Sequence, residues 1–226
     1  MILIDNETLK HKYITEYNID KIFTSDIKNE MKLIMYKKHE FLCKEDEVLE
    51  YLIFLIDGRA KSFVSLENGK NLLTCFYEDF QVIGDLETLS MKTASGSMQA
   101  LKDSYCIVIS MEFVRKNLME DAKFLRFICE NLGKKLHRCA HNSSINSLYP
   151  LENRLAAYIL KTSYGEEKLK FEGNLTEVAE LLGGSYRHLL RTLEAFCDKK
   201  YLNKQKGVYE VIDRASLKKL SAELYI

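Results

Sequence analysis

Short apolar runs rich in β-forming residues follow one another between Met31 and Ser110, and they constrain the fold more than any other feature. The expected strands are 31–36, 51–56, 59–66, 71–77, 80–83, 97–101 and 104–110. Two dipeptides between them, Asp57-Gly58 and Asn68-Gly69, are typical of type I′ hairpins, which need positive φ at both positions. Many short strands with frequent turns predict a jelly roll or a similar barrel.

Short helices and turns flank and interrupt this series of strands. Residues 8–30 are expected to form one or two short helices with a polar break at 24–26. Gly84-Asp85-Leu86-Glu87-Thr88-Leu89 follows a strand, and its glycine allows a tight turn into a short helix. Free N–H groups at the start of such a helix could face an anion or a polar ligand. A plain barrel corner explains the segment at least as well.

From about Ser110 to Ser147 the pattern becomes helical. Leu125, Cys129, Leu132, Leu136 and Cys139 recur at alternating spacings of four and three residues, which is an a/d seam. The seam predicts pairing with a second copy of the chain. Because it spans only about two heptads, packing of the helix on its own barrel stays open. The basic residues and histidine beside the seam should face solvent or a neighbouring domain: Lys134, Lys135, His137 and Arg138.

Tyr149-Pro150 marks the next boundary, because proline suits the first turn of a helix and disfavours helix in the residue before it. A helix is expected over 151–162. Residues 177–182 then predict a short helix capped by Asn174 or Thr176, and Gly183-Gly184 ends it. Ser185 can cap a second helix, from Tyr186 to about Cys197.

A helix, a short glycine-containing turn and a second helix form the helix-turn-helix arrangement that places a recognition helix in the DNA major groove. The apolar contacts between the two helices should come from Val178, Ala179, Leu182, Leu189, Leu190 and Leu193. Tyr186, Arg187, His188 and Arg191 are left at the start of the second helix. Arginine there suits bidentate contact to guanine, whereas Ser185 and His188 suit phosphate.

Residues 200–212 predict a basic hairpin with Lys206-Gly207 at or near its tip, a wing whose lysines, Lys204 and Lys206 among them, would touch the DNA backbone. The whole chain carries 33 basic and 33 acidic residues. Between Ser185 and Lys206, however, six basic residues face two acidic ones, a local charge of +4. Attraction to phosphate requires such a local face and not a basic chain as a whole.

Composition narrows the remaining function classes. Charges within the first residues and the lack of a long apolar run lead us to expect neither a signal peptide nor a membrane span. The six cysteines are scattered without a CxxC motif, which favours reduced thiols and a cytoplasmic location. His137 and His141 are four residues apart but have no third ligand nearby, so we expect no metal.

With these motifs in this order, the chain resembles the catabolite-activator/Fnr (Crp/Fnr) family of bacterial transcription regulators over nearly its full length. The resemblance rests on 51–58 with the strand that follows, 82–86, the long helix and 175–202; within the family, 153–157 and 185–190 are most similar to the YeiL-type subgroup. It implies an α+β fold: a cyclic-nucleotide-binding-like sensor jelly roll at 1–110, a dimerisation helix at 111–149 and a winged helix-turn-helix at 150–226. It also implies that Tyr186, Arg187 and Arg191 read base edges.

The resemblance also locates an effector pocket, with Gly84, Asp85, Leu86, Ser95 and Ser97 as its candidate residues. Members that bind cyclic AMP supply an Arg-Ser pair to the phosphate, but 93–97 contains no arginine, and Lys92 is a poor substitute because it is a point charge. We therefore do not expect cyclic AMP. An iron–sulfur cluster is not expected without an N-terminal cysteine cluster, nor haem with His39 as the one histidine near the barrel.

The function predicted from the sequence is that of a dimeric DNA-binding transcription regulator and not of an enzyme. Its expected partners are double-stranded DNA and a second copy of the chain, with RNA polymerase and a small-molecule effector as further candidates. Two alternatives stay open: a cupin-like barrel enzyme, and a ligand-binding module without DNA binding. Whether Cys129 and Cys139 sense redox state at the dimer seam is also open.

Overall fold

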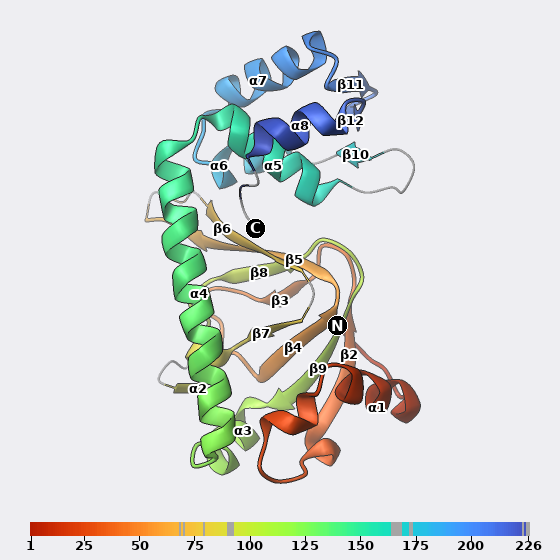
Figure 1. The fold of residues 1–226 in the computed structure, drawn as a ribbon, viewed down its shortest axis with the longest axis vertical. Helices are drawn as coiled ribbons and strands as arrows, with labels where there is room; N and C mark the ends of the chain where they lie inside the picture. Colours follow the sequence, from red (N-terminus) through yellow and green to blue (C-terminus); the bar gives the residue numbers. More distant parts are fainter. Residues whose placement is uncertain are drawn as a thin grey trace. The chain divides into compact units, whose positions relative to one another are not determined.

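The computed structural model describes residues 1–67, 69, 71–78, 80–89, 93–163, 169–171, 174–222 and 224. Helices and antiparallel sheets occur together, which confirms the predicted α+β class (Figure 1). The chain divides into two compact units. The first contains 1–64 and 77–138, and the second contains 65–76 and 139–226.

Two sheets form the barrel, and most of their strands lie in the first unit. In the described part of the chain, one sheet has the strand order β1-β2-β9-β4-β7 and the other the order β3-β8-β5-β6. The strands are β1 (Ile2–Leu3), β2 (Met31–Tyr36), β3 (Phe41–Cys43), β4 (Tyr51–Asp57), β5 (Arg59–Ser65), β6 (Asn71–Glu78), β7 (Gln81–Ile83), β8 (Ser97–Ala100) and β9 (Ser104–Ser110). Strands far apart in sequence pair directly, as in Ile53 opposite Val108, which is the non-local pairing of a jelly roll.

The prediction of a type I′ hairpin at Asp57-Gly58 is wrong. Neither residue has positive φ, and the strands on either side, β4 and β5, belong to different sheets. The dipeptide is the corner at which the chain passes from one sheet to the other. Glycine is required there for space, because a Cβ at Gly58 would overlap the Ser104 side chain. Of the second predicted hairpin signal, Gly69 has φ +76°, while Asn68 lies outside the described residues.

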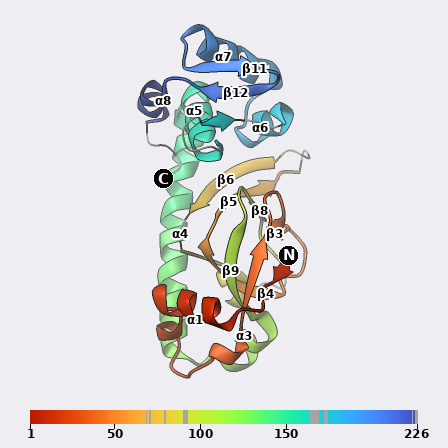
Figure 2. The same cartoon turned by 90° about the vertical axis from the view of Figure 1, so that its right-hand side faces the viewer.

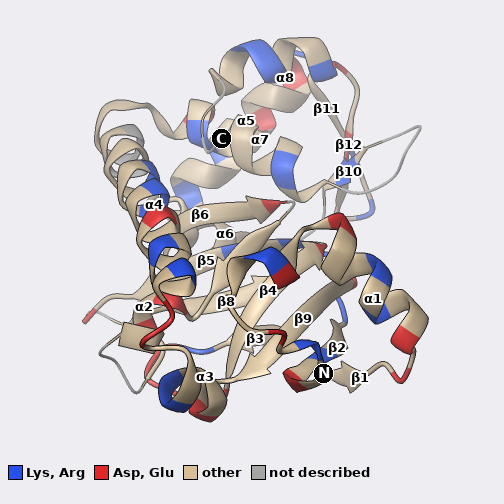
Figure 3. Cartoon of the chain, turned by 60° about the horizontal axis from the view of Figure 1, so that its bottom comes forward, with Lys and Arg blue, Asp and Glu red and all other residues tan. Residues whose placement is uncertain are grey.

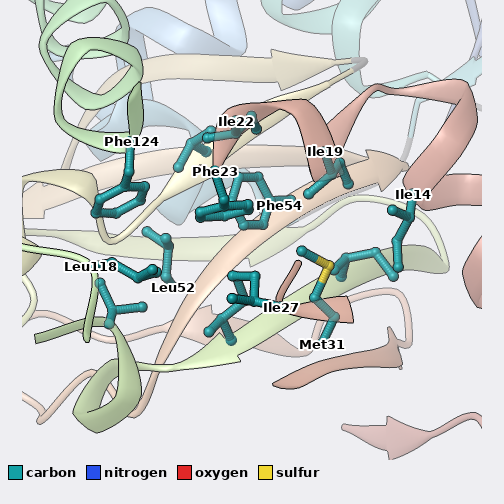
Figure 4. Close-up of a cluster of buried hydrophobic side chains, with 14 of the residues drawn as sticks. Ile14, Ile19, Ile22, Phe23, Ile27, Met31, Leu52, Phe54, Leu118 and Phe124 are labelled. Atoms are coloured by element: carbon teal, nitrogen blue, oxygen red, sulfur yellow. The ribbon is translucent and has the colours of Figure 1, made fainter. Parts of the chain in front are cut away.

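Helical segments pack against the sheet β1-β2-β9-β4-β7. They are α1 (Glu7–Glu16), the 3₁₀ turns Ile19–Ile22 and Lys28–Glu30, α3 (Met111–Asn117) and α4 (Ala122–Leu148), and their apolar side chains meet those of the sheet in one core. Figure 4 shows that core, in which the rings of Phe23 and Phe124 stack with their centroids 5.6 Å apart. Phe124 and Ile128 of α4 are fully buried. The long helix therefore does pack on its own barrel.

The same helix leaves part of the predicted seam uncovered within a single chain. Leu125 and Leu132 are half-buried against the barrel core, whereas Leu136 is 73% exposed. Cys129 and Cys139 are exposed as well. The two interpretations of this helix are thus compatible, because one face meets the barrel and another remains apolar and open.

The second unit combines short helices with a small sheet. Its elements are α5 (Leu151–Thr162), β10 (Lys170–Phe171), α6 (Leu175–Leu181), α7 (Tyr186–Asp198), β11 (Leu202–Gln205), β12 (Val208–Val211) and α8 (Arg214–Ser221). The sheet has the order β10-β12-β11 among the described residues. Figure 2 shows β11 and β12 running beside α7, with α8 next to α5. The short strand β10 and the helix α8 are not among the elements predicted from the sequence.

None of the helices in the described ranges has both the length and the apolar character that crossing a bilayer requires.

Candidate nucleic-acid interface

The two helices α6 and α7 begin at caps that the sequence predicted. The Asn174 side chain accepts hydrogen bonds from the backbone N–H groups of Thr176 (3.0 Å) and Glu177 (3.4 Å), so Asn174 is the cap of α6. The Ser185 hydroxyl accepts one from the N–H of His188 at 3.2 Å. Each cap satisfies donors that the first turn of a helix cannot pair internally.

The turn between these helices depends on its two glycines. Gly183 has φ +62°, in the left-handed region where a side chain is disfavoured. A Cβ at Gly184 would lie 3.1 Å from Leu151 of α5, so glycine lets the turn approach that helix closely. Arg154, also on α5, donates a hydrogen bond to the carbonyl oxygen of Leu182. The turn is therefore fixed both by its own backbone and by a guanidinium from the preceding helix.

Apolar packing sets which face of α7 is presented to solvent. The buried side chains of α6, the turn and α7 include Val178, Ala179, Leu181, Leu182, Leu189, Leu193 and Phe196. Leu190, predicted to join them, is half-buried. On the remaining face Arg187, His188 and Arg191 are exposed, and Tyr186 is 48% exposed. Arg187 and Arg191 thus point away from the packed core of the unit, as a groove-reading helix requires.

The wing forms as predicted, with its tip at Lys206-Gly207. Lys206 has φ +47° and Gly207 φ +85°, which is the backbone of a type I′ turn, and Gln205 pairs with Val208 across it. Lys204 and Lys206 are both exposed, and the Lys204 ammonium lies 5.5 Å from the centroid of the Tyr209 ring. Two cations therefore stand on the hairpin that follows α7.

The candidate effector residues lie around α2 (Asp85–Leu89) in the barrel. Gly84 has φ +94°, which is the predicted tight turn. Asp85 is buried, whereas Leu86 is 39% exposed. The N–H and the hydroxyl of Ser95 both donate to Glu87 at 2.9 Å. The hydroxyl oxygen of Ser97 accepts from the N–H of Glu45 at 3.1 Å.

Two charged contacts of this region were not predicted from the sequence. Lys135 of α4, expected to face solvent or a neighbouring domain, lies with its Nζ 2.6 Å from Asp85 Oδ1. Arg115 of α3 donates to the backbone carbonyl of Glu87 at 3.0 Å. The sequence contains no local signal for the first contact, since only the fold brings together residues 50 positions apart.

Comparison with known proteins agrees with both halves of this architecture. The family model described as "Cyclic nucleotide-binding domain" matches residues 33–121. The regulatory protein YeiL of Escherichia coli O157:H7 is 31% identical over 202 residues, which are 89% of this chain and 91% of the relative. The chain belongs to the Crp/Fnr family of transcription regulators.

Solved structures of Crp/Fnr proteins share the fold at low identity. A structure from Eubacterium rectale, described as a regulator of the Crp/Fnr family, superposes with a TM-score of 0.72 at 14% identity, covering 97% of this chain and 96% of that one. A Crp-family regulator from Thermus thermophilus gives 0.68 at 14% identity, with 85% and 98% covered. The 31% identical relative is named a regulatory protein, which confirms the prediction of a transcription regulator and not of an enzyme.

Proposed function

We propose that this Crp/Fnr protein regulates transcription by binding double-stranded DNA as a homodimer, with α7 of each copy in the major groove. One observation carries the proposal: Arg187 and Arg191 stand on the exposed face of a capped helix whose opposite face is buried. Guanidinium groups at the start of such a helix can bind guanine O6 and N7 in a bidentate manner. Tyr186 lies on the same face and is the third candidate for contact with base edges.

Contacts to the DNA backbone are assigned to the groups around that face. Ser185 and His188 lie at the N-terminus of α7, where free N–H groups and the helix dipole favour a phosphate. Lys204 and Lys206 on the wing add two exposed cations. Basic and acidic segments alternate over the rest of the chain (Figure 3), so this local arrangement and not the net charge directs DNA to the second unit.

The three functional parts are proposed to follow the boundaries expected from the sequence. Residues 1–110 act as the sensor, 111–149 as the dimerisation helix and 150–226 as the DNA-binding domain. The exposed Leu136, with Cys129 and Cys139 on either side of it, supplies an apolar strip for a second copy. Two recognition helices would then read half-sites one helical turn, about 34 Å, apart. A cytoplasmic location, contact with RNA polymerase and an effector bound near α2 complete the proposal.

A selection experiment tests the assignment of the reading residues. Duplexes selected from a random pool by the unmodified protein should share an inverted repeat. The double variant Arg187→Ala, Arg191→Ala should lose at least about 100-fold in affinity for that repeat, because each bidentate contact contributes about 1–3 kcal/mol. It should retain weak binding to unrelated duplex at low salt, which depends on phosphate contacts.

The matched control removes the same charge elsewhere. Lys12 and Lys21 are exposed on the barrel unit, far in sequence from the candidate interface. The variant Lys12→Ala, Lys21→Ala should bind the selected repeat as the unmodified protein does. Unchanged affinity and sequence preference in the double arginine variant, with the dimer intact, would remove α7 as the reading element.

A further inference from the structure

A group of charged side chains lies in the barrel unit around the buried carboxylate of Asp85. The Asp85 side chain is 2% exposed, and its Oδ1 is 2.6 Å from the Lys135 ammonium. The backbone N–H of Leu86 donates to the same oxygen at 3.1 Å. The other oxygen, Oδ2, is buried and has no hydrogen-bond partner among the described residues. An unpaired buried acceptor is costly, so this carboxylate has capacity for a further donor.

The surroundings of the Lys135 ammonium also favour a positive charge. Its Nζ lies 5.8 Å from the centroid of the Tyr77 ring, and the Arg138 guanidinium lies 5.6 Å from the same ring. Glu87, a second carboxylate, is 6% exposed on the same short helix. Burial and then the Glu87 carboxylate raise the pKa of the Cys43 thiol to about 12, so that thiol stays neutral. A buried carboxylate with a free acceptor and an aromatic face are the chemistry of a cation site.

We propose that this cluster is a binding site for a primary ammonium group, and that Lys135 is its built-in occupant. The ion pair joins α2, in the segment expected to meet an effector, to α4, the proposed dimerisation helix. An effector that breaks this ion pair would carry a primary ammonium group and would displace the Lys135 ammonium from Asp85. This inference rests on the proposed function only in treating the barrel as the sensor.

The test removes the Lys135 ammonium by mutation and supplies a small primary ammonium ion in solution. Lys135→Ala deletes three methylene groups and the ammonium, which n-propylammonium matches. Hydrogen exchange is followed on the full chain without DNA at the amides of Leu86 and Thr88, which donate to Asp85 Oδ1 and to the Gly84 carbonyl. Loss of Lys135 should speed their exchange by about tenfold or more, since local opening is no longer opposed by the ion pair. Millimolar n-propylammonium should reverse most of that change, and 1-propanol should not.

Two further variants complete the design. Lys135→Met keeps most of the side-chain stem without the charge, and it should also speed exchange in α2. Lys134→Ala removes the neighbouring exposed lysine of the same helix and should have no effect. Exchange in β9 reports whether the barrel remains folded. Unchanged α2 exchange in both Lys135 variants, or equal reversal by n-propylammonium and 1-propanol, would overturn the proposal. Because no DNA is present, such a failure is separate from failure of the DNA-binding proposal.

Discussion

Ser185 caps α7 with its hydroxyl. It also lies at the end of that helix where a DNA phosphate is proposed to bind. Its hydroxyl accepts the N–H of His188, which lacks a partner inside the helix. The cap was predictable because it depends on residues within one turn. The same holds for the type I′ turn at Lys206-Gly207, where both residues have positive φ.

Replacing Ser185 by alanine is expected to lower the free energy of unfolding by about 1 kcal/mol, because the capping bond is lost. Ser185→Asn retains a good capping side chain and should restore most of that loss. Urea unfolding of the full chain followed by circular dichroism measures both. A Ser185→Ala variant as stable as the unmodified protein would show that the cap contributes nothing to α7.

Two thiols, the buried Cys106 and the half-buried Cys43, should be slow to react at pH 8. Burial raises the pKa of Cys106, and burial together with Glu87 raises that of Cys43 to about 12. A raised thiol pKa leaves little thiolate at pH 8, and the thiolate is the reactive form. Iodoacetamide labelling followed by mass spectrometry should modify these two residues only after denaturation. Labelling of Cys106 in the folded protein at the rate of a free thiol would contradict its burial.

Contacts between residues far apart in sequence were beyond prediction. The pair Asp85–Lys135 and the hydrogen bond from Arg154 to Leu182 both join separate elements. Nothing in the local pattern around Lys135 distinguishes it from its neighbour Lys134. The packing of α4 on the barrel, through Phe124 and Ile128, turns Lys135 toward the barrel and leaves Lys134 exposed.

At the scale of elements, periodicity predicted what each segment is but not always what it pairs with. Strands β2, β4 and β9 and helix α5 were correctly predicted in type and nearly in bounds. Asp57-Gly58 was mistaken for a hairpin because the same dipeptide also serves a corner between sheets. Strand β10 has two residues and no periodicity to detect, and it forms only because β12 offers a free edge.

The wing makes a prediction at this scale. Removing both cations with Lys204→Ala, Lys206→Ala should weaken binding to all duplexes alike, since phosphate contacts carry no sequence information. The slope of log affinity against log salt should become less steep by about 3.6, because the dimer loses four phosphate contacts and each changes the slope by about 0.9. Fluorescence anisotropy titrations at several salt concentrations measure it. A selective loss for the preferred repeat alone would mean that the wing reads bases.

The exposed apolar strip of α4 leads to a prediction about dimerisation. Leu136→Asp puts a charge where a second copy is proposed to pack, and it should convert the dimer to monomer at micromolar concentration, because burying an unpaired carboxylate is strongly unfavourable. Leu136→Met conserves volume and should leave the dimer intact. Sedimentation velocity distinguishes the two. A Leu136→Asp protein that remains a dimer would place the interface elsewhere.

At the scale of the whole molecule, one chain joins two compact units. The barrel contains the buried Asp85–Lys135 pair and the second unit presents the exposed arginines of α7. A chain with no net charge can still attract DNA, because the excess of positive charge is local to 185–206, whereas basic and acidic residues are interspersed along the rest of the ribbon (Figure 3). The architecture was predictable from the order of the motifs, whereas the cation site in the barrel was not.

Helix α7 is proposed to read guanine edges in the major groove through Arg187 and Arg191. Methylation interference on a selected inverted repeat tests it most directly, because dimethyl sulfate modifies guanine N7 in the major groove and adenine N3 in the minor groove. Methylation of guanine N7 in each half-site should block binding, and the double arginine variant should show no such guanine positions. Interference restricted to adenine N3, or the same guanine pattern in that variant, would contradict it.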